Sequence, residues 1–150
     1  MHTDIEYTAA NPQGTQGNVL DLLLPAIRGN YKAPLLIWQS GSGWLSDCIG
    51  KIIPPDILDF FLNKGYAVAA VNVRSSSQVK FPGQLYDIRA AIRWLRTNAG
   101  NYGIDPDRFA IMGTSSGGWV AAMAATTPPV PPPATTTSNL RMGSRFTGSS

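Results

Sequence analysis

The stretch FPGQLYDIRAAIRWLRTNAGNYGIDPDRFAIMGTSSGGWVAA, residues 81–122, decides the predicted fold. Apolar residues recur at spacings of three and four over 85–99, with arginines elsewhere on the turn, which predicts an amphipathic helix. A turn expected at 105–107 leads into a short apolar strand at 109–112. A turn rich in glycine and serine follows, and then a helix of small residues over 119–125. Helix, strand and helix in this order are typical of an α/β chain.

The segments before this stretch supply further predicted elements. Residues 18–24 alternate partly and stop at a proline, and residues 35–38 are continuously apolar, so both predict strands. Residues 56–62 are apolar on one helical side and predict a helix. Residues 66–73 are apolar on both faces, as in a strand covered on both sides. The pattern therefore predicts an α/β fold with a mainly parallel sheet and helices on both faces.

A composition break near Thr127 divides the 150 residues into two parts. Residues 1–126 carry all nine acidic residues and ten of the twelve basic ones, and we interpret them as a partial domain. Residues 127–150 contain no acid and begin with five prolines within six positions, 128–133. Such a segment has too few apolar side chains to offset its ordering entropy. We therefore expect 127–150 to be a disordered Pro/Thr/Ser-rich tail.

Charge and cysteine content exclude several classes of protein. The net charge is +3, and no two basic residues are adjacent, so a nucleic-acid partner is not predicted. One cysteine, Cys48, and one histidine, His2, exclude an internal disulfide and the usual zinc and histidine clusters, so we expect no metal or cofactor. There is no apolar stretch of membrane-spanning length and no signal-like start, which favours a cytoplasmic location.

The sequence Gly113-Thr114-Ser115-Ser116-Gly117 matches the pattern G-x-S-x-G. It lies between a predicted strand and a predicted helix, where a tight turn would lift Ser115 above the sheet. The amides at the start of the helix would then face that serine and favour an oxyanion. The competing interpretation is a serine that caps a helix in a glycine-rich turn.

A second glycine-rich loop, SGSGW at 40–44, follows the predicted strand 35–38. Such a loop can supply further backbone donors to the same oxyanion. A Rossmann loop would need a glycine at position 46, which is serine. A P-loop would need Gly-Lys-Ser/Thr, and the chain has no such triplet.

On these residues the chain resembles the α/β-hydrolase superfamily, in the esterase/lipase branch with hormone-sensitive-lipase-like and BD-FAE-like feruloyl and acetyl-xylan esterases. The resemblance covers about residues 4–126 and rests on four stretches: NVLDLLLP (18–25), SGSGW (40–44), KGYAVAAVNVR (64–74) and 81–122. It implies a three-layer α/β-hydrolase fold, C-terminally truncated in this chain. The family usually reads H-G-G-G-W at the loop and G-x-S-A-G-G at the turn. This chain has Ser40 and Ser42 in the loop and Ser116 in the turn instead.

The resemblance implies a role for each site residue. Ser115 would be the nucleophile of a serine carboxylic-ester hydrolase acting on a small acyl or aromatic ester. Asp87 would be structural, close to Arg74, and not the catalytic acid, since it precedes the nucleophile. The remaining site comprises oxyanion-hole amides and pocket residues: Ser42, Gly43 and Ser116 for the amides, and Gly41 and Trp44 for the pocket.

The acid and base of the triad are missing from this chain. In α/β-hydrolases they follow the nucleophile, and after Ser115 the sequence contains no Asp, Glu or His. His2 would have to reach from the far end of the sheet. We therefore expect an esterase by ancestry with little activity. The alternative is a non-catalytic protein that binds a ligand in the remaining pocket or associates through an exposed sheet edge at 109–112.

Overall fold

The structure is a computed structural model that describes residues 1–27 and 29–126. The predicted tail at 127–150 lies outside the described residues. The elements follow one another as β1 (His2–Glu6), β2 (Val19–Leu23), β3 (Ala33–Gln39), α1 (Pro55–Asn63), β4 (Ala67–Val71), α2 (Gly83–Asn98), the short 3-10 helix η1 (Ala99–Tyr102), β5 (Ile104–Gly113) and α3 (Ser116–Thr126).

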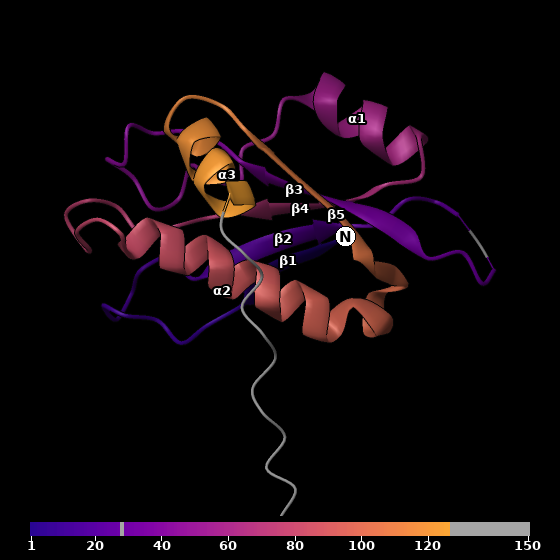
Figure 1. Cartoon of the computed structure of the whole chain (residues 1–150), viewed down its shortest axis with the longest axis horizontal. Coiled ribbons are helices and arrows are strands. Elements are labelled where there is room, and N and C mark those ends of the chain that lie inside the picture. The colour runs from indigo at the N-terminus through magenta and orange to yellow at the C-terminus, as the bar shows by residue number, and fades with distance from the viewer. Residues whose placement is uncertain (28, 127–150) are drawn as a thin grey trace, which may run out of the picture.

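The strands form one five-stranded sheet in the order β1-β2-β4-β3-β5 (Figure 1). β3 pairs in parallel with both β4 and β5, whereas β2 pairs antiparallel with β1 and β4. The sheet is therefore mixed, and the predicted parallel pairing of the segments 35–38, 66–73 and 109–112 is confirmed. Because parallel strands end on the same side of the sheet, the turns that follow β3 and β5 lie together.

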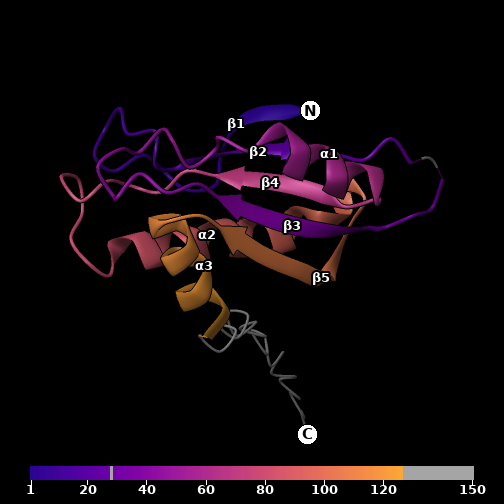
Figure 2. The same ribbon diagram turned by 90° about the horizontal axis from the view of Figure 1, so that it is seen from above.

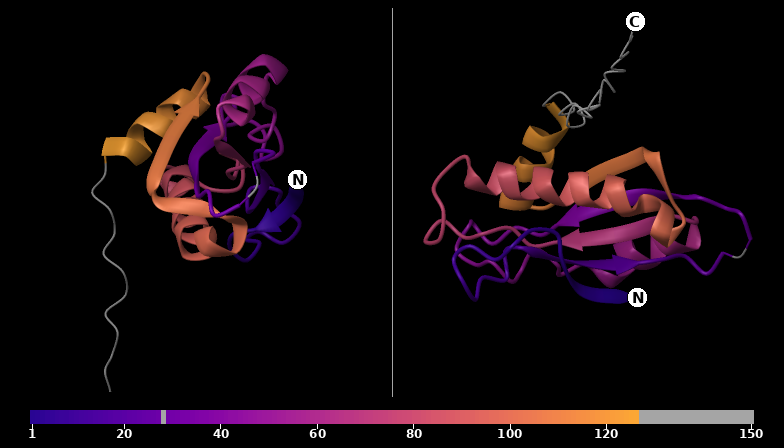
Figure 3. Two further views of the ribbon diagram at one scale, coloured as in Figure 1. Left: turned by 90° about the vertical axis from the view of Figure 1, so that its right-hand side faces the viewer. Right: turned by 90° about the horizontal axis from the view of Figure 1, so that it is seen from below.

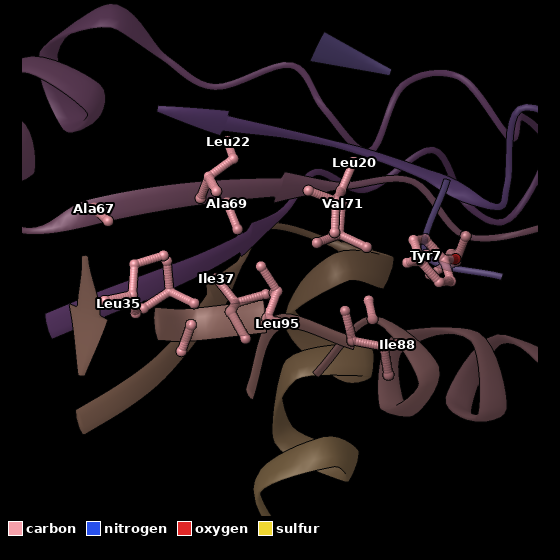
Figure 4. Packing of buried hydrophobic residues seen from close by; sticks show 14 of the residues in the cluster. Tyr7, Leu20, Leu22, Leu35, Ile37, Ala67, Ala69, Val71, Ile88 and Leu95 are labelled. Carbon is pink, nitrogen blue, oxygen red and sulfur yellow. The ribbon is translucent and has the colours of Figure 1, made fainter. Parts of the chain in front are cut away.

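Helices cover both faces of the sheet, as the α/β pattern predicts. Figure 3 shows α1 on the opposite side of the sheet from α2 and α3. The face toward α2 buries Leu35 and Ile37, which pack in one cluster with Ile88 and Leu95 (Figure 4). The other face buries the alternate residues of β3, and there the indole Nε1 of Trp38 donates to the carbonyl of Ile52 at 3.0 Å.

Strand β5 begins earlier than the sequence predicts. Ala33 of β3 pairs with Ile104, but Leu35 pairs with Phe109, so β5 advances five residues while β3 advances two. The predicted turn at 105–107 lies in this irregular part of the strand. There the carboxylate of Asp105 accepts a hydrogen bond from the amide of Asp107 at 3.0 Å. The predicted turn is therefore present, but it lies inside strand β5 and not before it.

The first residues of the chain form an edge strand that is not among the elements predicted from the sequence. β1 pairs antiparallel with β2. The ammonium group of Lys51 bonds the carboxylates of Asp4 and Asp21, one from each of these strands. The amide of Asp4 also donates to Asp21 at 2.8 Å. Among residues 1–27 and 29–126, no helix has the length and apolar character to cross a bilayer.

Candidate active site

Ser115 lies in the turn between β5 and α3, where the sequence places it. Its backbone adopts a left-handed conformation with φ of +53°, which is unfavourable for a residue with a side chain. The turn is closed by hydrogen bonds from the amides of Gly117 and Gly118 to the carbonyl of Thr114, at 2.8 and 3.2 Å. A helix-capping residue usually has an extended backbone, so the left-handed φ speaks against the competing capping interpretation. Ser115 is exposed, and Ser116, the first residue of α3, is buried.

The two glycines of the motif allow this turn to pack against the end of β3. A Cβ added to Gly113 would lie 2.5 Å from the carbonyl oxygen of Gln39, and one added to Gly117 would overlap the same oxygen. The amide of Thr114 donates to that carbonyl at 3.3 Å. The end of strand β3 is thereby in direct contact with the turn.

The loop after β3 contacts the turn directly. A Cβ added to Gly41 would lie 2.6 Å from the Cβ of Ser115 and 2.8 Å from the amide nitrogen of Ser116. The loop is braced internally, since the hydroxyl of Ser42 donates to the carbonyl of Ser46 at 3.0 Å. Figure 2 shows α3 beside the ends of β3 and β5, which brings these two glycine-rich turns together.

The amides of Ser42 and Gly43 converge on one oxygen atom, but it is the hydroxyl oxygen of Ser116. Ser42 N donates to Ser116 Oγ at 3.1 Å, and Gly43 N donates to the same atom at 3.0 Å. The sequence led us to expect these amides beside the hydroxyl of Ser115. Two converging amides are an arrangement that stabilises an oxygen carrying negative charge. In this structure the hydroxyl oxygen of Ser116 occupies the position where such an oxygen would bind.

Aromatic rings flank the turn. Trp44, whose φ is +61°, meets Trp119 edge to face with a centroid distance of 5.8 Å. Phe81 meets Trp119 at the same distance, and 69% of its surface is exposed. Of these three rings, only Trp44 was expected at the site from the sequence. Trp119 lies two positions after the motif, and this nearness could have suggested a contact with the site.

The loop that carries these amides is tied to distant parts of the chain through Asp47. Its carboxylate accepts hydrogen bonds from the side chains of Thr15 and Gln78, at 2.9 and 2.6 Å, and from the amide of Gln16 at 2.9 Å. Burial alone would raise the pKa of Asp47, but these hydrogen bonds outweigh it and lower the pKa below its ordinary value. The ionised carboxylate therefore helps to hold the loop.

Asp87 and Arg74 form a partly buried ion pair. Arg74 Nη2 lies 2.7 Å from Asp87 Oδ1, and the amide of Arg74 donates to Asp87 Oδ2 at 3.0 Å. The hydrogen bonds to Asp87 raise the pKa of Arg74. The pair joins the segment after β4 to the first turns of α2. This arrangement agrees with the structural role that the resemblance implies.

His2 lies in β1, at the opposite edge of the sheet from β5 (Figure 2). Its ring contacts Tyr102 at a centroid distance of 5.1 Å, and Tyr102 precedes the first residue of β5, whereas Ser115 follows the last. The single imidazole is therefore at the other end of that strand from the turn. Within the described ranges, no three His, Cys, Asp or Glu side chains are grouped to hold a metal ion.

Comparison with known proteins identifies similar chains. The BD-FAE family model matches residues 20–136. Esterase LipQ of Mycobacterium tuberculosis is 31% identical over 120 residues, which cover 79% of this chain and 27% of that protein. An arylesterase of Saccharolobus solfataricus is 37% identical over 86 residues, covering 56% of this chain and 27% of that protein.

Solved structures also superpose on this chain. A bifunctional GH43-CE protein of Bacteroides eggerthii superposes with a TM-score of 0.72 at 34% identity, over 80% of this chain and 16% of the other. An esterase of Thermogutta terrifontis superposes with a TM-score of 0.68 at 26% identity, over 87% of this chain and 47% of the other. The chain thus spans about a quarter of the length of its curated relatives.

Proposed function

Because the chain belongs to the BD-FAE family of α/β-hydrolase esterases, we propose that it carries the nucleophile half of a serine carboxylic-ester hydrolase, with Ser115 as the nucleophile. The observation that carries the proposal is the left-handed Ser115 in a strand-to-helix turn, with Gly41 of a second glycine-rich loop against it. The names of the relatives, esterase and arylesterase, support ester chemistry.

The proposed reaction proceeds through an acyl-enzyme. Ser115 Oγ attacks the carbonyl carbon of the ester, and the carbonyl oxygen becomes an oxyanion held by the amides of Ser42, Gly43 and Ser116. The C–O bond to the alcohol then breaks, and the alcohol leaves with the proton that the serine hydroxyl has lost. Water attacks the acyl-serine in the second half-reaction, which releases the carboxylic acid and restores the hydroxyl.

Both steps need a base near Ser115, and this chain supplies none after that residue. The only histidine, His2, lies at the other end of β5. A serine hydroxyl without an adjacent base keeps its proton at neutral pH and is a weak nucleophile. We therefore propose that this chain alone hydrolyses esters far more slowly than an ordinary enzyme, whose turnover is on the order of 10 s⁻¹.

The proposed substrate is a small ester with an acyl or aromatic group. Trp44, Trp119 and Phe81 form an aromatic cluster beside the turn, and Phe81 is largely exposed. Gly41 lets the loop that carries Trp44 pack directly against the turn of Ser115. An apolar group bound against these rings would bring its carbonyl close to Ser115.

A non-catalytic role is the second candidate, favoured by one specific observation. The hydroxyl oxygen of Ser116 accepts hydrogen bonds from the same two loop amides that would bind the oxygen of an ester. In this case the chain binds an acyl or aromatic ligand against the rings, or associates with a partner through β5. Among the described residues, β5 has a strand neighbour on one side only.

Covalent labelling tests the assignment of the nucleophile without a complete triad. We expect a fluorophosphonate probe to modify Ser115 slowly, and millimolar imidazole, acting as an external base, to accelerate the reaction. Peptide mass spectrometry would locate the adduct, and Ser115→Ala should abolish it while leaving the fold intact. An adduct on another serine, or equal labelling of urea-unfolded protein, would exclude Ser115 as the activated nucleophile.

Turnover of p-nitrophenyl acetate tests the second part of the proposal. We expect only slow hydrolysis, little changed in Ser115→Ala, because it would come from the backbone amides. Rapid hydrolysis that is lost in Ser115→Ala would contradict this expectation. His2→Ala would then show whether the N-terminal imidazole supplies the base.

A further inference from the structure

The hydroxyl of Ser116, at the first position of α3, is hydrogen-bonded to the loop that follows β3. Its oxygen is buried and accepts two hydrogen bonds, from Ser42 N at 3.1 Å and Gly43 N at 3.0 Å. A hydroxyl oxygen has two lone pairs, so these two donors use its accepting capacity. Each backbone amide has one proton to donate, so Ser42 and Gly43 have none left for another acceptor in this geometry.

We propose that Ser116 is a built-in occupant of the loop amides, and that a ligand oxygen reaches these amides only by displacing the Ser116 hydroxyl. This inference rests on the proposed function, because it concerns access to the same oxyanion site. A stabilising donor has to lie about 2.7–3.1 Å from the oxygen it serves. The Ser116 oxygen already lies at that distance from both amides.

The competition favours charged over neutral ligands. The Ser116 hydroxyl is a neutral acceptor, attached to the backbone, and loses no translational freedom when it binds. A neutral ester carbonyl would accept hydrogen bonds of similar strength from the two amides. Replacing the hydroxyl by that carbonyl therefore brings no gain in binding free energy. An anionic oxygen makes charge-assisted bonds that are roughly twice as strong, so it can displace the hydroxyl. Ser116 is therefore a specificity-determining residue that discriminates against uncharged carbonyl groups.

Replacement of Ser116 by alanine removes the occupant and keeps the backbone donors. Alanine is also favourable in a helix, so α3 should be retained. The amides of Ser42 and Gly43 then lack an acceptor and become available to a ligand. Removing a competing hydrogen bond should raise the affinity for a small carboxylate by about tenfold.

The test is an acetate titration of ¹⁵N-labelled full chain, followed through the amide resonances of Ser42 and Gly43. We expect weak shifts in the wild type and saturable shifts at about tenfold lower acetate concentration in Ser116→Ala. Should Ser116→Ala not fold, Ser116→Cys carries the same prediction, since sulfur is a weak acceptor. An unchanged or lower acetate affinity in the variant would overturn the proposal.

A matched control separates displacement from simple loosening of the loop. Ser46→Ala removes the hydrogen bond from the amide of Cys48 to the Ser46 hydroxyl, at 3.3 Å in the same loop, and leaves Ser42, Gly43 and Ser116 in place. We expect no gain in acetate affinity from this variant. A gain equal to that of Ser116→Ala would mean that loop mobility, and not occupancy, limits binding, and would also overturn the proposal.

The outcome is independent of whether Ser115 is a nucleophile. Acetate does not acylate Ser115, so the double variant Ser115→Ala/Ser116→Ala should still bind acetate more tightly than Ser115→Ala does. Acetate binding without fluorophosphonate labelling would refute the proposed function and keep the inference about Ser116. If Ser115 is labelled but Ser116→Ala does not change acetate binding, the proposed function is supported and the inference about Ser116 is refuted.

Discussion

Gly41 and Ser115 approach so closely that a Cβ on the glycine would lie 2.6 Å from the Cβ of the serine. Real Cβ atoms do not come this close, so the contact depends on the missing side chain. Gly41 is not among the residues with positive φ, and space alone requires glycine there. The loop after β3 and the turn after β5 therefore pack as one unit.

Gly41→Ala should push the loop after β3 away from the turn after β5. The new methyl group would meet the backbone of the turn, including the carbonyl oxygen of Thr114 at 2.5 Å, which cannot move aside as a flexible side chain could. We expect a loss of about 1–3 kcal/mol in the free energy of unfolding. Fluorophosphonate labelling of Ser115 should fall as well. Urea denaturation and mass spectrometry would measure the two effects.

Gly100→Ala is the matched control for this substitution. Its Cβ would have nothing within 4 Å, and its φ is not positive. We expect wild-type stability and labelling from it. If Gly41→Ala and Gly100→Ala had equal stability and equal labelling, the close contact of Gly41 with the turn would contribute to neither property.

The neighbouring glycines Gly117 and Gly118 should differ sharply in their tolerance of alanine. A Cβ on Gly117 would overlap the carbonyl oxygen of Gln39 at the end of β3, whereas one on Gly118 would lie 3.3 Å from the carbonyl oxygen of Gly113. Both residues are in α3, so the gain in helix propensity is the same. We expect Gly117→Ala to lose at least about 2 kcal/mol more than Gly118→Ala in thermal or urea unfolding. Similar losses would contradict the close contact of β3 with α3.

Ser115 stores backbone strain that glycine should relieve. A left-handed residue with a side chain costs roughly 1–2 kcal/mol, and Ser115 has φ of +53°. We expect Ser115→Gly to be more stable than Ser115→Ala by about 1 kcal/mol, because glycine adopts this φ freely although it loses more entropy on folding. Urea unfolding of the two variants gives the comparison. If Ser115→Ala is the more stable, the turn is not strained at this position.

Tyr7 should make the stability depend on alkaline pH. Its hydroxyl lies 2.6 Å from the carbonyl oxygen of Gly17 and 2.8 Å from that of Asn72, and its one proton is shared between them. Burial, and then the charge of Asp87, raise the pKa of Tyr7 well above its ordinary value of 10.0, against a smaller opposing effect of Arg74. Above pH 10 the unfolded chain releases this proton while the folded chain keeps it. Stability from the neutral phenol is therefore complete below pH 10 and declines as the pH rises toward the folded pKa.

Tyr7→Phe should be less stable at neutral pH, because two carbonyl groups lose their donor, but its stability should decline less steeply above pH 10. The difference in slope approaches about 1.4 kcal/mol per pH unit. Urea unfolding at several pH values would measure it. Tyr86→Phe is the control for the loss of a tyrosine hydroxyl, since that ring is 58% exposed and the variant should keep wild-type stability at neutral pH. Parallel pH profiles for wild type and Tyr7→Phe would contradict the assignment.

Local patterns were enough to predict most of the elements. The three-and-four spacing of 85–99 predicted α2, and the apolar runs 35–38 and 66–73 predicted β3 and β4, each within a few residues of the observed bounds. These patterns succeed because each reports which faces of an element are buried. The strand at His2–Glu6 has mostly exposed side chains, so no such pattern marks it. Its pairing depends on β2 and on Lys51, which are distant in sequence.

The amino-acid sequence determined the strand-to-helix turn at Ser115, because glycines at 113 and 117 and the flanking apolar elements are local features. It also determined that no acid or imidazole follows Ser115 in this chain. Tertiary structure alone decided which acceptor the loop amides bind. Ser42 and Ser116 are 74 positions apart, and only the parallel pairing of β3 with β5 brings them within 3.1 Å. The replacement of one small residue by another at position 116 was visible in the sequence, but its effect on the amides depends on that distance.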